Sequence, residues 1–441
     1  MSRRKVLFLS SAPVGGQMIG PAIRAYEMAR ALAPRADVTV AAVAGDGPAP
    51  ELDVPLIQFR PADPRELRPH IDAADVIVGQ PQWPVVAHWL KRSGARLIYD
   101  LYDPETLESI EFFSERSAAI RWLMTTLSVD RLLDALYSGH HFICATRRQR
   151  DLWTGAMLAE RLIQPSTYDR DPALESVIEL VPFGLSDEPP VHPGHGGLRE
   201  RFPQIGADDE IVLWNGGIWS WLDPGTAVEA MARLAERRPR ARLVFMGVGS
   251  QAPARRASEA TRELAQKLGI LDRHVFINED WVPYQERAAW LLEASCAVST
   301  HVEHLESSYA FRTRLLDCFW AGLPVVCTQA DELAERVERD GLGATVPERD
   351  PAALADALER VLERGRDAYV DALRDAAADY TWTRVVEPIA RWVEEPSLPP
   401  RLGDARPLPM RHAMHALRTN GFVATRAALR AVGISDWPNF S

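Results

Sequence analysis

Short apolar runs alternate with helix-periodic segments along most of this sequence, and this alternation limits the possible folds more than any other feature. A first series predicts strands at residues 5–10, 38–43, 56–59, 75–78, 96–99 and 141–145. A second series predicts strands at residues 210–214, 242–246, 274–276, 296–299, 324–327 and 344–346. Strands that alternate with helices form parallel sheets with helices on both faces. The sequence therefore predicts an α/β chain with two Rossmann-like, doubly wound domains.

Composition between the two series sets the domain boundaries. Residues 186–208 are dominated by proline, glycine and polar residues, which is typical of a linker. We assign the first domain to residues 1–190, the linker to 191–208 and the second domain to 209–378. Residues 379–395 are expected to form a helix, kinked at Pro388, that crosses back to the first domain. Ligands bind outside the carboxyl ends of strands in such sheets, so we expect a ligand-binding cleft between the two domains.

Charge and cysteine content exclude several classes of protein. The 441 residues carry a net charge of −11, which argues against a general nucleic-acid binder. The cysteines show no C-x-x-C spacing, so neither a zinc site nor a disulfide framework is expected, and no carboxylate cluster demands a metal. The first apolar run is too short for a signal peptide, and no apolar stretch is long enough to span a membrane. We therefore expect a soluble, cytoplasmic protein.

The last segment, residues 396–441, differs in charge from the acidic body of the chain. Its only acidic residues are Asp404 and Asp436, and its basic residues include Arg401, Arg406, Arg411, Arg418, Arg426 and Arg430. A basic tail of this kind can rest on an anionic membrane surface, as a peripheral contact at its inner face, or can pack against the first domain. The sequence leaves both possibilities open.

Glycine-containing loops follow the first expected strand of each domain. Residues 15–20 precede a helix whose first turn carries Arg24, and residues 216–217 lead to Trp219. Another glycine turn, at Gly247, follows the second strand of the second domain. Neither loop has the dinucleotide-binding G-x-G-x-x-G pattern or the lysine of a P-loop. Glycine still lets the backbone approach a ligand closely, so both loops are candidate binding loops.

Residues 105–137 form a long helical insertion after the expected strand at 96–99. An insertion after the carboxyl end of a strand lies where ligands usually bind in such a sheet. A helical hairpin that only packs against the domain is the alternative.

The stretch from Glu306 to Pro324 holds the densest group of candidate site residues. Glu306 lies in a loop, and Arg312, Arg314 and Asp317 follow in the first turns of a helix that Gly322-Leu-Pro324 should end. The backbone N–H groups and dipole of a helix N-terminus attract anions, and two arginines add positive charge. The stretch predicts an anion site, or else a surface helix with a salt-bridged first turn.

Together, the glycine loop at 15–20 with Arg24, the Gly216-Gly217 loop, and the Glu306–Pro324 stretch resemble GT-B retaining glycosyltransferases, and among them glycosyltransferase family 4 (group 1). The resemblance covers residues 4–395. It implies transfer of a hexose-type sugar from a nucleotide sugar to a saccharide or lipid-linked glycan acceptor, with retention, in surface polysaccharide or glycoconjugate biosynthesis. It also implies that no metal or other cofactor is required.

The same resemblance implies roles for individual residues. In the family, two glutamates seven residues apart contact the donor sugar and the ribose; here Glu306 and Asp317 take those places, with ten residues between them. The family's diphosphate-binding lysine and its acceptor-side histidine are missing, and we assign their work to the arginines and to Asp103. Catalytic roles fall on Glu306, Arg312 and Asp103. Donor-binding roles fall on Gly216, Gly217, Trp219, Gly247, Trp281, Val282, Ser307, Arg314 and Asp317. Acceptor-binding roles fall on Gly20, Arg24 and Tyr102.

Two other functions remain open at this point. A sugar-nucleotide epimerase, or a pseudo-glycosyltransferase that joins non-sugar rings, could use the same fold. A non-catalytic sugar-nucleotide-binding partner would also tolerate the missing lysine and histidine. An ordinary oxidoreductase is disfavoured because neither series opens with the dinucleotide fingerprint.

Overall fold

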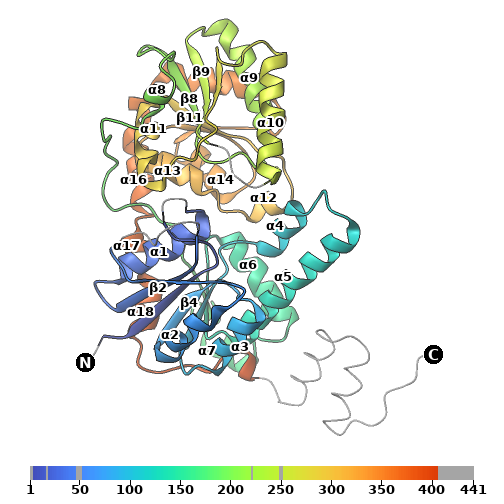
Figure 1. Ribbon diagram of the computed structural model, residues 1–441, viewed down its shortest axis with the longest axis vertical. Coiled ribbons are helices and arrows are strands. Elements are labelled where there is room, and N and C mark those ends of the chain that lie inside the picture. Colours follow the sequence, from blue (N-terminus) through green and yellow to red (C-terminus); the bar gives the residue numbers. More distant parts are fainter. Residues whose placement is uncertain (1–2, 16–17, 46–51, 220–221, 248–251, 406–441) are drawn as a thin grey trace, which may run out of the picture.

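The computed structural model describes residues 3–15, 18–45, 52–219, 222–247 and 252–405. Two separate parallel sheets, each covered by helices, form two lobes stacked along the long axis of the molecule (Figure 1). The first sheet has the order β3-β2-β1-β4-β5-β6-β7 and the second has the order β10-β9-β8-β11-β12-β13. The predicted fold class is confirmed. Gly16 and residues 406–441, which hold most of the basic tail, lie outside the described residues.

The first sheet consists of β1 (Lys5–Ser10), β2 (Asp37–Val43), β3 (Leu56–Phe59), β4 (Val76–Gly79), β5 (Arg96–Asp100), β6 (His141–Cys144) and β7 (Ile178–Leu180). The six predicted strands match the first six within one residue at each end. The sequence pattern missed β7 because it is only three residues long and contains a glutamate. β1 is buried from Val6 onward and pairs on its two sides with β2 and β4.

Helices cover this sheet on both faces. They are α1 (Gly20–Leu32), η1 (Pro64–Leu67), α2 (Arg68–Ala73), α3 (Pro84–Arg92), α4 (Glu105–Phe112), α5 (Ala118–Ser138), α6 (Arg147–Ala159) and α7 (Pro165–Arg170). The expected insertion is the α4–α5 hairpin, and α4 contacts the second domain through α12 (Leu305–Tyr309). Figure 1 shows this hairpin beside the junction of the two lobes.

The second sheet consists of β8 (Glu210–Trp214), β9 (Ala241–Phe245), β10 (Val275–Ile277), β11 (Cys296–Ser299), β12 (Val325–Thr328) and β13 (Gly343–Val346). Its helices are α8 (Leu198–Arg201), α9 (Pro224–Arg237), α10 (Ala252–Lys267), η2 (Tyr284–Glu286), α11 (Arg287–Glu293), α12, α13 (Thr313–Ala321), α14 (Glu332–Arg339), α15 (Pro351–Arg364), η3 (Arg366–Tyr369) and α16 (Val370–Ala378). α13 ends at Gly322, whose φ of 62° is the left-handed conformation that glycine adopts without strain.

The chain crosses between the domains twice, and the two crossings are joined to each other. The backbone N–H of Leu185 donates to the carbonyl oxygen of Tyr380 (2.6 Å), and the N–H of Trp382 donates to the carbonyl oxygen of Leu185 (2.9 Å). The return segment forms α17 (Trp382–Val385) and α18 (Glu387–Glu394), with the break just before Pro388. Arg35 of the first domain pairs with two glutamates of α18, which holds the returning helix on that domain.

The segment between the domains is partly ordered against the second domain. Its helix α8 buries Leu198, and Arg199 N–H donates to Glu293 Oε2 of α11 at 2.7 Å. After α18, the described chain ends with η4 (Leu402–Ala405), which packs on α5. In the described ranges, every helix is too short or too polar to cross a lipid bilayer.

Candidate active site between the domains

Loops from the carboxyl ends of strands in the two sheets meet between the domains. Gln149, fully buried in the first turn of α6, donates through Nε2 to the carbonyl oxygens of Tyr102 (2.6 Å) and Tyr309 (2.8 Å). Tyr102 follows β5 in the first domain, and Tyr309 ends α12 in the second. One amide therefore joins the predicted acceptor loop to α12. Glu306, which we expected in a loop, lies in the first turn of this short helix.

Arg314 is a positive charge held inside the second domain. Its Nη2 donates to the carbonyl oxygen of Gly217 at 3.1 Å, and its guanidinium carbon lies 5.4 Å from the centre of the Trp214 ring. No carboxylate among the described residues pairs with it, and its Nη1 has no hydrogen-bond partner there. Burial, with the nearby charge of Arg312, lowers the pKa of Arg314 to about 9. An uncompensated, partly buried cation at a glycine loop is what an anionic ligand would neutralise.

Arg312 has a different environment, although it lies only two residues away. Its Nη2 donates to Glu306 Oε2 at 3.3 Å, and its Nε lies 3.7 Å from Asp331 Oδ2. All three side chains are buried. Arg312 is therefore already compensated by two carboxylates, which changes our interpretation of it from a phosphate contact to the residue that holds Glu306 in place.

The loop before α12 is fixed by a reciprocal cap. His304 Nδ1 accepts from the backbone N–H of Ser307 at 3.2 Å, and Ser307 Oγ accepts from the N–H of His304 at 3.0 Å. The Ser307 hydroxyl also donates to the carbonyl oxygen of His304 at 2.7 Å. Its single proton is thus engaged, so Ser307 positions the first turn of α12 and we no longer place a sugar hydroxyl on it.

Buried polar atoms without a hydrogen-bond partner gather around these residues. Of the twelve such atoms found among the described residues, seven lie in or just after the loops that follow β10, β11 and β12. They belong to Trp281, His301, His304, Arg312, Arg314 and Asp331. Two of the seven, Arg312 Nε and Asp331 Oδ2, form the ion pair at 3.7 Å given above, so five are left without any partner in the described residues. Each such atom costs roughly 1–3 kcal/mol when it stays unpaired, so a cluster of them marks a place built for a polar ligand.

Asp317, expected at the ribose, takes part in a stacked ion pair. Its Oδ1 lies 3.0 Å from Nε of the buried Arg287. The Arg287 guanidinium lies between the rings of Tyr284, at 3.6 Å from the ring centre, and Trp320, at 4.6 Å. Asp317 remains partly accessible, so a ribose hydroxyl could reach its second oxygen.

The other predicted donor residues lie along the same edge of the second sheet. Gly216 has a φ of 94° and is exposed, and a side chain there would lie against Arg314. A side chain at Gly247 would come within 3.1 Å of the carbonyl oxygen of Asp280, which leads directly to Trp281. Trp219 and Val282 are partly buried and pack against the core. Of the predicted donor residues, Gly216 and Gly217 lie beside Arg314, and Gly247 lies beside the loop that leads to Trp281.

On the first domain, Arg24 is enclosed by the protein itself. It donates to both carboxylate oxygens of Asp100 (2.6 and 3.0 Å) and to the carbonyl oxygens of Val181 and Pro182. It also lies over the Tyr102 ring. These contacts leave the guanidinium little to offer an acceptor, so we interpret Arg24 as the residue that fixes Asp100 and the loop after β5.

Gly20 and Tyr102 meet at the start of α1. A Cβ at Gly20 would come within 3.0 Å of the Tyr102 hydroxyl, so only glycine fits without displacing the ring. Burial raises the pKa of Tyr102 well above its usual value, so the phenol keeps its proton. The predicted acceptor residues Gly20, Arg24 and Tyr102 therefore pack against one another, between the start of α1 and the loop after β5.

Asp103 lies beside Glu108, a residue that the sequence analysis did not single out. Its carboxyl group hydrogen-bonds with that of Glu108, in the first turn of α4. Burial and mutual repulsion raise the pKa of Glu108 well above its usual range, and burial raises the pKa of Asp103. Such a pair holds one proton between two carboxyl groups. Glu306 of the second domain acts electrostatically on both, so the pair faces the site from the opposite wall.

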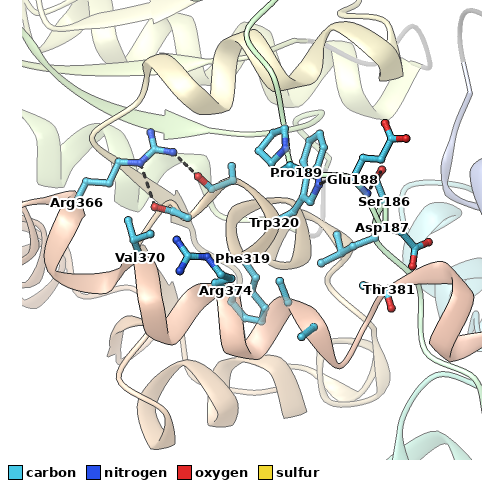
Figure 2. A pocket seen from close by; sticks show the side chains of 16 residues that line it. Ser186, Asp187, Glu188, Pro189, Phe319, Trp320, Arg366, Val370, Arg374 and Thr381 are labelled. Carbon is cyan, nitrogen blue, oxygen red and sulfur yellow. Dashed lines mark hydrogen bonds between the residues drawn. The ribbon is translucent and has the colours of Figure 1, made fainter.

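A cavity of about 400 Å³ lies elsewhere, at the two domain crossings. Figure 2 shows Trp320 and Pro189 on one side of it and Val370 and Arg374 on another. The Trp320 indole N–H donates to the carbonyl oxygen of Glu188 at 2.7 Å, so the ring is anchored to the linker. Through Trp320 this cavity borders the Arg287–Asp317 pair, but it contains none of the predicted site residues. Within the described ranges, no cluster of three or more His, Cys, Asp or Glu could hold a metal ion.

Comparison with known proteins agrees with this geometry. Residues 210–364, most of the second domain, match the family described as "Glycosyl transferases group 1". A D-inositol 3-phosphate glycosyltransferase of Frankia alni is 28% identical over 229 residues, which are 51% of this chain and 54% of the relative. A phosphatidyl-myo-inositol mannosyltransferase of Mycobacterium leprae is 41% identical over 88 residues, 19% of this chain and 23% of the relative. The chain thus spans about half the length of the first relative and less of the second.

Solved structures resemble nearly the whole chain. The sucrose-phosphate synthase of Thermosynechococcus elongatus superposes with a TM-score of 0.63 at 18% identity, covering 88% of this chain and 98% of its own. Anabaena HepE in complex with UDP-glucose superposes with a TM-score of 0.65 at 14% identity, covering 88% and 99%. Identities this low establish the fold alone. The chain therefore has a GT-B fold, and its residues 210–364 are similar to the group 1 glycosyl transferases.

Proposed function

We propose that this protein transfers a hexose-type sugar from a nucleotide sugar to a saccharide or lipid-linked glycan acceptor, with retention of the anomeric configuration. The observation that carries the proposal is the cluster of buried, unpartnered polar atoms around Arg314. A diphosphate would supply the negative charge and the acceptor oxygens that Arg314 lacks. HepE has been solved with UDP-glucose, which supports a nucleotide sugar as the ligand class.

The two domains would each serve one substrate, the second domain the donor and the first domain the acceptor. Arg314 would stabilise the charge that develops on the departing nucleoside diphosphate. Glu306, held by Arg312 and His304, would contact the sugar from the second domain. Asp103 and Glu108 would receive the acceptor hydroxyl from the first domain. Retention rests on the family resemblance. A role in surface polysaccharide or glycoconjugate synthesis is consistent with the phosphatidyl-myo-inositol in the name of one relative, although the other relative's name gives D-inositol 3-phosphate.

Binding is tested first, with a thermal-shift panel of UDP, GDP, dTDP and ADP and their common sugars. A ligand at 100 times its Kd adds about 2.7 kcal/mol to the free energy of unfolding. We expect one nucleotide to stand out and its effect to disappear in Arg314→Gln. Arg233→Gln, which removes an exposed arginine from α9 of the same domain, is the matched control and should keep the shift. A panel without any shift in the wild-type chain would contradict the proposal.

Turnover then separates the rival functions. With the selected donor carrying a labelled sugar, an epimerase would change the donor without any acceptor, whereas a transferase forms a new glycoside only when a glycan acceptor is added. Glu306→Gln should abolish the new glycoside and leave nucleoside diphosphate binding within about twofold. A non-catalytic sugar-nucleotide-binding protein would form no glycoside in the wild type with any acceptor.

A further inference from the structure

His301 is a buried histidine whose ring has no partner. It follows β11 directly, at the carboxyl end of the strand, and is 1% exposed. Neither Nδ1 nor Nε2 has a hydrogen-bond partner among the described residues. Other buried histidines differ: His140 Nδ1 accepts from the N–H of Leu97 at 2.9 Å, and His141 Nδ1 lies 3.0 Å from the carbonyl oxygen of Ser176. A fully buried imidazole with two free nitrogens is placed to meet something that is not part of the protein.

The surroundings of His301 keep its ring neutral. Burial, together with the charges of Arg312, His304 and Arg314, lowers the pKa of His301 to about 3. A neutral imidazole offers one N–H donor and one nitrogen acceptor. It therefore cannot act as a counter-charge to a phosphate, which is the part that Arg314 is placed to take. A hydroxyl group can accept from the N–H or donate to the other nitrogen, so sugar hydroxyls are suitable partners for each of the two ring nitrogens.

His301 is connected to two parts of the site, the glycine loop that starts at Gly216 and the helix α12. His301 lies three residues before His304, the N-cap of α12, and α12 carries Glu306. The backbone of His301 bridges to Leu222, at the end of the glycine loop that starts at Gly216. Glu306 in turn acts on the Asp103–Glu108 pair of the first domain. His301 is thus joined through Leu222 to the glycine loop that holds Arg314, and along the chain to the helix that carries Glu306.

We propose that His301 is a specificity residue for the donor sugar, which it recognises through hydrogen bonds between its ring nitrogens and hydroxyl groups of the sugar. The proposal rests on the proposed function, since it names the part of a nucleotide sugar that this residue contacts. It predicts that the ligand class is a hydroxylated pyranose, and that a donor deoxygenated at the contacted carbon binds less well. The proposal gives two neighbouring residues different functions: Arg314 binds the diphosphate, and His301 recognises the sugar.

The test compares two ligands that differ only in the sugar. By titration calorimetry on the full chain, we would measure the Kd of the nucleoside diphosphate that gives the largest thermal shift, and the Kd of its glucose and mannose derivatives. The variants are His301→Phe, which keeps a flat ring without nitrogens, and His301→Asn, which keeps one donor and one acceptor. His141→Phe, a buried histidine of the first sheet with one unpartnered nitrogen, is the matched control.

In His301→Phe we expect the Kd of the nucleotide sugar to rise about tenfold or more, which is the loss of one or two hydrogen bonds. The Kd of the nucleoside diphosphate should stay within about twofold, and His301→Asn should recover most of the loss. The ligand-free Tm of His301→Phe should not fall, because two unpaired buried atoms are removed. His141→Phe should change neither Kd.

Each contrary result has its own meaning. An equal loss of affinity for nucleoside diphosphate and nucleotide sugar would place His301 at the phosphates and overturn the inference, while the proposed function stands. Unchanged affinity for both, or a Tm several degrees lower with unchanged affinity, would make His301 a structural residue and overturn the inference as well. Failure of the wild-type chain to bind any nucleotide would overturn the proposed function itself.

Discussion

Replacing Arg314 with methionine should stabilise the ligand-free protein and weaken its binding of nucleotide. Methionine keeps the length of the side chain but removes the charge. Burial has lowered the pKa of Arg314 to about 9, and no carboxylate in the described part of the chain compensates it. At about 1.4 kcal/mol for a change of one in pKa, carrying this charge costs the free protein at most about 5 kcal/mol.

Part of that gain is offset by contacts that the substitution removes. The bond to the carbonyl oxygen of Gly217 and the contact with the Trp214 ring contribute about 1 kcal/mol each. We expect a net gain of about 1–2 kcal/mol, or a Tm roughly 2–8 °C higher. Affinity for the nucleoside diphosphate should fall roughly 10- to 150-fold, the range of a lost charge-assisted hydrogen bond.

The same substitution two residues earlier is the matched control. Arg312→Met leaves the buried carboxylates of Glu306 and Asp331 without their cation, and breaking a buried pair in this way costs about 3–5 kcal/mol. Thermal scans with and without the nucleoside diphosphate should therefore move the two variants in opposite directions. If Arg314→Met lowers the Tm as much as Arg312→Met does and retains its nucleotide affinity, Arg314 is a structural cation and the reasoning is refuted.

Three further predictions follow from the packing and charge of the described residues. The pKa of Glu108 is raised in the folded protein, so the wild type loses stability as the pH rises from 5 to 8 and this carboxyl group ionises. Glu108→Gln lacks this loss and should therefore gain stability relative to the wild type in thermal scans over that range. A difference in Tm that stays constant with pH would contradict the shared proton. Gln149→Leu should lower the free energy of unfolding, measured in urea, by about 2–3 kcal/mol, because two buried carbonyl groups lose their donor. A loss below about 0.5 kcal/mol, which is the effect of a neutral surface substitution, would show that these bonds do not hold the domains together. Gly343→Ala should prevent stable folding, because its Cβ would lie 1.9 Å from the carbonyl oxygen of Val325 on the neighbouring strand; a Tm within a few degrees of the wild type would contradict this register.

The sheets could be predicted closely because their strands are buried on both faces. Such strands appear in the sequence as continuous apolar runs, and the runs at 5–10, 210–214 and 296–299 match strands residue for residue. The edge strand β7 lacks this signal, since Glu179 interrupts it and pairs with Arg391 of the returning helix. The turn Gly322-Leu-Pro324 was also readable, because a left-handed glycine and a proline end a helix by local rules.

The site was predictable in location but not in the division of tasks. The sequence alone placed Arg312 and Arg314 together in the first turns of one helix. Only the fold shows that Asp331, in the loop after β12, compensates Arg312 and not Arg314. Glu108 reads as an ordinary acidic residue in the first turn of a helix, and its pairing with Asp103 depends on how α4 leaves the loop. His301 had a usable signal, because it comes directly after a strand at the edge where such sheets bind ligands.

The ligand-free site holds two charges that the protein leaves uncompensated, and they lie on opposite walls. The second domain retains the cation of Arg314, and the first domain retains an excess of acid in the Asp103–Glu108 pair. Under the proposed function this separation matches the reaction, in which negative charge grows on the departing diphosphate and positive charge grows on the sugar between the walls. Without the other domain, each domain would carry an unpaired charge. Gln149 donates to the carbonyl oxygens of Tyr102 and Tyr309 and so holds the two domains together beside these opposite charges.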